Sequence, residues 1–173
     1  DYYRIIGMKT GALFAIAAEL GAALNGAPAE VCASLNAFGM QIGTAYQIYD
    51  DCIDLAGDES RIGKTLGSDL RRGKLTLPIL HLLGSASLAE KARMTAQILS
   101  GDEEGVRALV GRAIEAGAVR YAVERGCAML DDARERLEVV PVSGAGSGIY
   151  RGAMEDLCVT LRGLIAPLGE HGA

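Results

Sequence analysis

The sequence is poor in aromatic residues and carries no net positive charge. It has no tryptophan, only two phenylalanines, and 17 basic against 22 acidic residues, for a formal charge of −5. Domains that bind nucleic acid usually present a basic surface, often with aromatic side chains on which bases stack. We therefore expect no nucleic-acid partner.

Cysteine and histidine are scarce and widely spaced. The four cysteines form no Cys-x-x-Cys pair, and neither histidine lies near a cysteine at the spacing of zinc ligands. This usage predicts reduced, partly buried thiols in a cytoplasmic protein rather than disulfides or a zinc site. We expect His81 to be structural.

Long apolar runs are also missing. No signal peptide is visible, and the most apolar stretch, residues 11–29, carries Glu19 near its middle. A membrane-spanning helix needs about 20 apolar residues, so we expect no transmembrane segment. Half of the 173 residues are hydrophobic, which is enough for one domain with a real core.

The hydrophobic spacing is helical almost throughout, which predicts an all-α fold. Pro28 is expected to begin a long helix, because Val31, Leu35, Phe38 and Ile42 recur at helical spacing behind it. Glycine, serine and proline mark the breaks. The expected helices cover residues 2–25, 28–55, 75–83, 87–99, 103–116, 118–138 and 149–168.

An acidic stretch lies at the end of the second helix, in Tyr-Gln-Ile-Tyr-Asp-Asp-Cys-Ile-Asp at residues 46–54. Asp50 and Asp54 share one helix face and Asp51 lies beside them. Three close carboxylates in apolar surroundings are costly unless they are paired or bind a cation, and Mg²⁺ prefers carboxylate and phosphate oxygens. The stretch predicts a metal site for a phosphorylated ligand; the alternative is a solvated acidic patch.

Two basic elements flank this stretch. Downstream, residues 57–74 are rich in glycine and carry Lys64, Arg71, Arg72 and Lys74 within 64–74. Ser68 is a plausible N-cap for a short helix there. A P-loop is excluded, because Asp58 stands where its first glycine is required. Upstream, Lys-Thr at residues 9–10 interrupts an apolar helix, and both side chains suit the remaining oxygens of a metal-bound phosphate.

These elements, in this order and at these spacings, resemble the second half of the trans-polyprenyl diphosphate synthases, or polyprenyl synthetases. The resemblance is strong over residues 1–80 and continues through Leu-Thr-Leu-Pro at 75–78. It implies the type I isoprenoid synthase fold, an all-α bundle. It also implies that residues 1–173 are the C-terminal part of a single domain.

The resemblance implies a prenyl transfer assisted by Mg²⁺. An allylic diphosphate ionises, isopentenyl diphosphate attacks the cation, and a proton is lost. A longer trans-polyprenyl diphosphate results. By the same resemblance, Asp50 is a direct metal ligand, Asp54 holds a metal-bound water, and Asp51 supports the cluster.

Other roles also follow from the resemblance. Lys9 and Lys64 contact the allylic diphosphate, while Lys74 either does the same or anchors the loop by pairing with Asp69. Thr10 and Gln47 line the place where the new bond forms, and Lys9 is counted with them among the catalytic residues. Homodimerisation is a further expectation from the family.

The family's first aspartate-rich motif is missing from the sequence. We therefore expect a longer protein and an inactive fragment; the alternative is a natural stand-alone chain. Three other functions stay open: a terpene cyclase-like enzyme, a non-catalytic subunit of a heteromeric synthase, and a plain helical interaction module. A second acidic pair, Asp131 and Asp132, is expected to be a solvated face, because Arg134 and Arg136 neutralise it.

Overall fold

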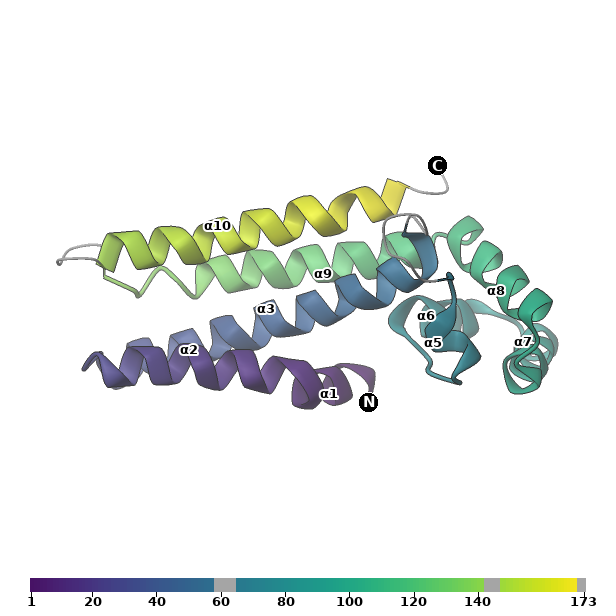
Figure 1. The fold of residues 1–173 in the computed structure, drawn as a ribbon, viewed down its shortest axis with the longest axis horizontal. Helices are drawn as coiled ribbons and strands as arrows, with labels where there is room; N and C mark the ends of the chain where they lie inside the picture. The colour runs from purple at the N-terminus through teal and green to yellow at the C-terminus, as the bar shows by residue number, and fades with distance from the viewer. Residues whose placement is uncertain (58–64, 142–146, 171–173) are drawn as a thin grey trace. The chain divides into compact units, whose positions relative to one another are not determined.

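The computed structural model describes residues 1–57, 65–141 and 147–170, which contain helices and no strand. The all-α prediction is therefore confirmed for the described part of the chain (Figure 1). The elements are α1 (Tyr2–Ile6), the π-helix η1 (Gly7–Gly11), α2 (Ala12–Leu24), α3 (Ala29–Ala56), α5 (Ser68–Arg71), α6 (Leu77–Ser85), α7 (Leu88–Ser100), α8 (Glu103–Glu115), α9 (Ala118–Glu135), α10 (Ser147–Ile165) and the 3₁₀-helix η2 (Ala166–Glu170).

Most predicted boundaries lie within two or three residues of the observed ones. The first helix ends where Asn25 and Gly26 predict, and Gly26 has φ +73°, a conformation that favours glycine. Pro78 lies in the first turn of α6, where its missing N–H costs no hydrogen bond. The last predicted helix, 149–168, begins two residues earlier and tightens into η2 after Ile165.

The chain divides into two compact units. The first comprises residues 1–47 and 125–164. In it, α3 packs on α2 on one side, and α10 runs beside α9 (Figure 1). The predicted apolar face of α3 is buried there, with Ile42 only 1% exposed. Ser34 Oγ donates to the carbonyl oxygen of Arg136 at 2.7 Å, and Arg162 donates to Asp131 at 2.6 Å. Asp131 therefore serves packing between helices α9 and α10.

The second unit comprises residues 48–124 and 165–173 and contains α5 to α8. Helix α7 begins with a capping box, in which Ser87 and Glu90 satisfy each other's backbone N–H groups. Gly67 lies against α8: a Cβ at this position would stand 2.8 Å from Val106 Cγ1. His81 stacks on Tyr121 with ring centroids 3.9 Å apart, which fits its expected structural role.

The helical run Tyr2–Leu24 keeps much of its apolar surface exposed. Leu13, Ile16, Leu20 and Leu24 lie on one face at helical spacing and are 44–85% exposed. By length and composition alone, this run could cross a membrane, and only 22% of its apolar window is buried. The expected absence of a transmembrane segment therefore stays a prediction for this run, which is a candidate by length and composition only because helix continues through Lys9 and Thr10.

Candidate functional site

Lys9 and Thr10 lie on the π-helical turn η1, not on regular α-helix. The wider turn spans Gly7 to Gly11 and interrupts the predicted helix at the Lys-Thr pair. Such single π turns are often found at functional sites. Lys9 is exposed, whereas Thr10 is half-buried and donates its Oγ1 hydrogen to Gln47 Oε1 at 2.8 Å. The structure thus brings together two side chains that lie 37 residues apart in the sequence.

Glycines permit this contact by letting two helices approach closely. A Cβ on Gly11 would lie 2.7 Å from Met40 Sδ and 3.0 Å from Thr44 Oγ1. A Cβ on Gly43 would lie 2.8 Å from the Cα of Gly11. A side chain at Gly43 would force the two backbones apart, and one at Gly11 would displace the side chains of Met40 and Thr44. Gln47 itself is 4% exposed, so its amide oxygen needs the bond that Thr10 supplies.

The three aspartates at the end of α3 have different surroundings. Asp50 is exposed, Asp51 is fully buried, and Asp54 is half-buried. The uniform acidic cluster that the sequence suggests is therefore divided into one solvent-facing carboxylate and two with inner partners. Asp51 is buried because only one side of the last turns of α3 faces solvent. Asp54 shares a face with Asp50 but is half-buried, because Ser68 and Asp69 bind its carboxylate.

Lys74 forms an ion pair with the buried Asp51. Its Nζ lies 2.9 Å from Asp51 Oδ1 and 2.6 Å from Asp69 Oδ2. Partial burial by itself would lower the pKa of Lys74, but hydrogen bonds to Asp69 and Asp51 outweigh it and raise the pKa. The pairing with Asp69 fits the anchoring role that the sequence suggested for Lys74; its contact with a diphosphate stays a prediction.

Asp54 holds the start of α5. Its Oδ1 accepts from the backbone N and the Oγ of Ser68 at 3.1 and 2.6 Å, and its Oδ2 accepts from the backbone N of Asp69 at 3.0 Å. The prediction that Ser68 is the N-cap is wrong by one position: Gly67 is the N-cap, with φ +74°. The N–H groups that a cap would satisfy are bound by Asp54 from α3 instead.

Cys52 lies between these aspartates and is fully buried. Burial, followed by the neighbouring charge of Asp51, raises the pKa of its thiol to about 12. A thiol with a raised pKa and no exposed surface lacks the thiolate character of a reactive cysteine.

The donor set suits magnesium in its usual protein mode. Within the described ranges, no three side chains of His, Cys, Asp or Glu gather closely enough to enclose a metal ion. Mg²⁺ is commonly held by one or two carboxylates, with waters and substrate phosphates completing the shell. Exposed Asp50 and half-buried Asp54 fit that mode, whereas Asp51 is already paired with Lys74.

The predicted site residues fall into both units. Lys9, Thr10 and Gln47 belong to the first, and Asp50, Asp51, Asp54 and Lys74 belong to the second. Lys64 lies outside the described residues. The sequence did not predict the contact between Asp54 and Ser68; its one indication was a serine within the glycine-rich segment 57–74.

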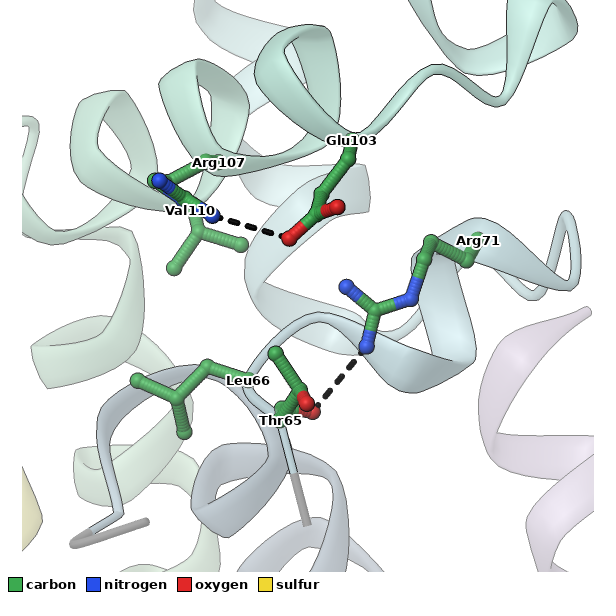
Figure 2. A pocket seen from close by; sticks show the side chains of 6 residues that line it. All are labelled: Thr65, Leu66, Arg71, Glu103, Arg107 and Val110. Carbon is green, nitrogen blue, oxygen red and sulfur yellow. Dashed lines mark hydrogen bonds and ion pairs between the residues drawn. The ribbon is translucent and has the colours of Figure 1, made fainter.

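A pocket of about 450 Å³ lies in the second unit, apart from the predicted residues. Figure 2 shows Arg71 donating to the carbonyl oxygen of Thr65 and Arg107 paired with Glu103, at 3.2 and 2.9 Å. The remaining lining residues are Leu66 and Val110. None of the predicted site residues lines this pocket.

Comparisons with known proteins agree with the motifs. The family described as polyprenyl synthetase matches residues 1–115. A short chain isoprenyl diphosphate synthase from Methanothermobacter thermautotrophicus is 39% identical over 149 residues, which are 84% of this chain and 45% of that protein. The chain thus spans about half the length of the relatives it matches.

Solved structures give the same result for the fold. A decaprenyl diphosphate synthase from Rhodobacter capsulatus matches with a TM-score of 0.83 and 30% identity, over 95% of this chain and 50% of that one. A polyprenyl synthase from Caulobacter crescentus, solved with calcium and isoprenyl diphosphate, matches with a TM-score of 0.81 and 29% identity, over 93% and 48%.

Proposed function

Because the chain belongs to the polyprenyl synthetase family, we propose that it forms part of a trans-prenyltransferase. The reaction condenses an allylic prenyl diphosphate with isopentenyl diphosphate to give a longer trans-polyprenyl diphosphate. The observation that carries this proposal is that neighbouring aspartates at the end of α3 have different surroundings. Asp50 faces solvent, while its neighbour Asp51 is buried and neutralised by Lys74.

Magnesium is the proposed cofactor. It would neutralise the negative charge that grows on the departing diphosphate, which is otherwise a poor leaving group. Asp50 would hold the ion directly and Asp54 would hold one of its waters. Asp51 would support both by fixing Lys74 and the segment that follows Gly67. The calcium bound with isoprenyl diphosphate in the Caulobacter relative supports a divalent cation.

Lysines would bind the diphosphate oxygens that the metal leaves uncovered. We assign this role to Lys9 and Lys64, and to Lys74 through the third of its side chain that stays exposed beside Asp51 and Asp69. Ammonium groups suit these oxygens because each is a compact charge with several donors.

Thr10 and Gln47 would stabilise the positive allyl fragment. Since the Thr10 hydroxyl donates its hydrogen to Gln47, the lone pairs of its oxygen remain to face positive charge. No nucleophilic serine or cysteine is required. The departing diphosphate, already close to the new bond, is the proposed base that removes the proton.

The test is calorimetric binding of an allylic diphosphate, such as geranyl diphosphate, to the 173-residue chain. We expect binding that requires Mg²⁺ and that Asp50→Asn weakens by about tenfold or more, the cost typical of losing a charged metal contact. Glu115→Gln, an exposed carboxylate at the end of α8, is the matched control. Absence of Mg²⁺-dependent binding would favour a plain helical interaction module.

We propose that catalytic turnover requires the longer protein of which these residues form a part. We propose that the 173 residues alone give no condensation from the two diphosphates and Mg²⁺, and product formation by this chain would refute that. We further propose a cytoplasmic homodimer. A cyclase or a non-catalytic subunit is less consistent with the three retained aspartates and with relatives named as synthases.

A further inference from the structure

Among the residues that the structure describes, every hydrogen bond that reaches Asp54 from outside its own helix comes from three consecutive residues, Gly67 to Asp69. The carbonyl oxygen of Asp54 accepts from the backbone N of Gly67 at 2.6 Å. Its carboxylate accepts from both donors of Ser68 and from the backbone N of Asp69. Asp54 thus holds this turn against α3, in addition to the Asp51–Lys74–Asp69 ion pairs.

The bonds are distributed unevenly between the two carboxylate oxygens. An ionised carboxylate offers about four acceptor positions, two on each oxygen. Ser68 fills both positions on Oδ1, through its backbone N at 3.1 Å and its Oγ at 2.6 Å. Oδ2 accepts from the backbone N of Asp69 alone among the described residues. One acceptor position therefore remains, on Oδ2.

From this count we infer that Ser68 is a positioning residue for the metal site. Its hydroxyl holds Oδ1 and so presents Oδ2 as the single oxygen of Asp54 that can reach a magnesium-bound water. The inference rests on the proposed function, because it assigns Ser68 a role only if Asp54 serves a metal.

The hydroxyl, rather than the backbone, carries this role. The short Oγ–Oδ1 contact is a charge-assisted bond, stronger than a neutral one. Without it, Oδ1 regains an open acceptor position and can compete with Oδ2 for the same water or cation. The backbone hydrogen bonds would persist, so the turn would remain attached to α3. The carboxylate of Asp54, however, would no longer present Oδ2 in preference to Oδ1. Loss of such outer partners typically weakens metal binding by about 10–100-fold.

The experiment measures binding of inorganic diphosphate to the 173-residue chain by calorimetry, with excess Mg²⁺ and again with EDTA. We expect Ser68→Ala to weaken the Mg²⁺-dependent binding about tenfold. Ser68→Thr, which keeps the hydroxyl, should bind like the wild type. Ser68→Cys, nearly isosteric with a weak donor, should behave like the alanine variant. Ser85→Ala is the control, because it also loses one hydroxyl hydrogen bond, which goes to the carbonyl oxygen of His81 and not to a carboxylate.

Melting temperatures separate positioning from folding. A purely structural serine would lower the melting temperature without changing diphosphate affinity in the folded range, and that result would overturn the inference. Equal affinities of wild type and the alanine and cysteine variants would do the same while leaving the proposed function intact. If the wild type itself shows no Mg²⁺-dependent binding, the proposed metal site is contradicted, and with it the positioning role of Ser68.

Discussion

At the scale of single residues, the ion pair of Asp51 and Lys74 determines how much stability is lost by burying a carboxylate in the acidic stretch. The Asp51 side chain is completely buried, and Lys74 meets it at 2.9 Å. A buried carboxylate is tolerated only when a cation and hydrogen bonds compensate its lost hydration. Asp69, 20% exposed, shares the same ammonium group, so Lys74 also holds the segment after Gly67 against α3.

Lys74→Met should therefore reduce the free energy of unfolding by about 2 kcal/mol, since it removes the cation that compensates a buried carboxylate. Lys91→Met, on the exposed face of α7, is the control and should change little. Chemical denaturation followed by circular dichroism measures both. Equal stability of the two variants would mean that Asp51 is not compensated by Lys74.

The same pair predicts a dependence on pH. The pKa of Lys74 is raised in the folded state above its ordinary value of 10.5. The stabilisation is therefore fully present below pH 10.5 and is lost as the pH rises through the folded pKa. The stability gap between wild type and Lys74→Met should stay constant from neutral pH to about pH 10 and narrow above it.

At the scale of elements, the close approach of η1 and α2 to α3 decides whether Thr10 reaches Gln47. Gly43→Ala would place a methyl group 2.8 Å from the Cα of Gly11, so the helices must separate. We expect a loss of about 1–3 kcal/mol in stability, as for other overpacked interiors. The Thr10–Gln47 bond should lengthen or break.

Gly21→Ala provides the matched control on α2, because nothing lies within 4 Å of its new Cβ. It should stabilise the helix slightly, by about 0.5–1 kcal/mol. Thermal melts give the stabilities, and a crystal structure or amide chemical shifts report the contact of Thr10. If both alanine variants gained stability, the interhelical packing at Gly43 would be looser than the structure indicates.

Elements differ in how far the sequence could predict them. The long helices were predictable because Val31, Leu35, Phe38 and Ile42 repeat at helical spacing and Pro28 and Gly26 mark the ends. The π turn was not, because the hydrophobic spacing of residues 2–24 is that of a continuous α-helix; in the structure Gly7 and Gly11, at the two ends of this turn, lie against Met40 on another helix. The spacing of residues along one helix does not indicate a contact with another helix.

The site was predictable in composition but not in arrangement. The spacing of Asp50, Asp51 and Asp54 indicates which residue types act together, and that remains the basis of the proposed metal site. It does not tell which carboxylate is buried. That depends on Lys74 and Ser68, which reach α3 through a glycine-rich segment whose path the sequence pattern does not define.

At the scale of the whole molecule, the exposed stripe of Leu13, Ile16, Leu20 and Leu24 requires a covering surface. A contiguous apolar face of this kind usually marks an interface with protein or membrane. Glu19 and Lys9 on the same run disfavour a membrane, since a charged side chain at bilayer depth is costly, and Glu19 accepts from Asn36 at 2.6 Å. The homodimer proposed above would cover the stripe with a second copy.

The double variant Leu13→Lys with Leu20→Lys should weaken that dimer by at least about tenfold, because each buried leucine contributes about 1.5–3 kcal/mol. Leu88→Lys is the control, since Leu88 is 88% exposed and lies on α7, which does not contribute to the stripe. Sedimentation velocity across a range of concentrations would show the wild type and the control as dimers and the double variant as monomers. A monomeric wild type would contradict the dimer, and flotation of the wild type with phospholipid vesicles would assign the stripe to a membrane instead.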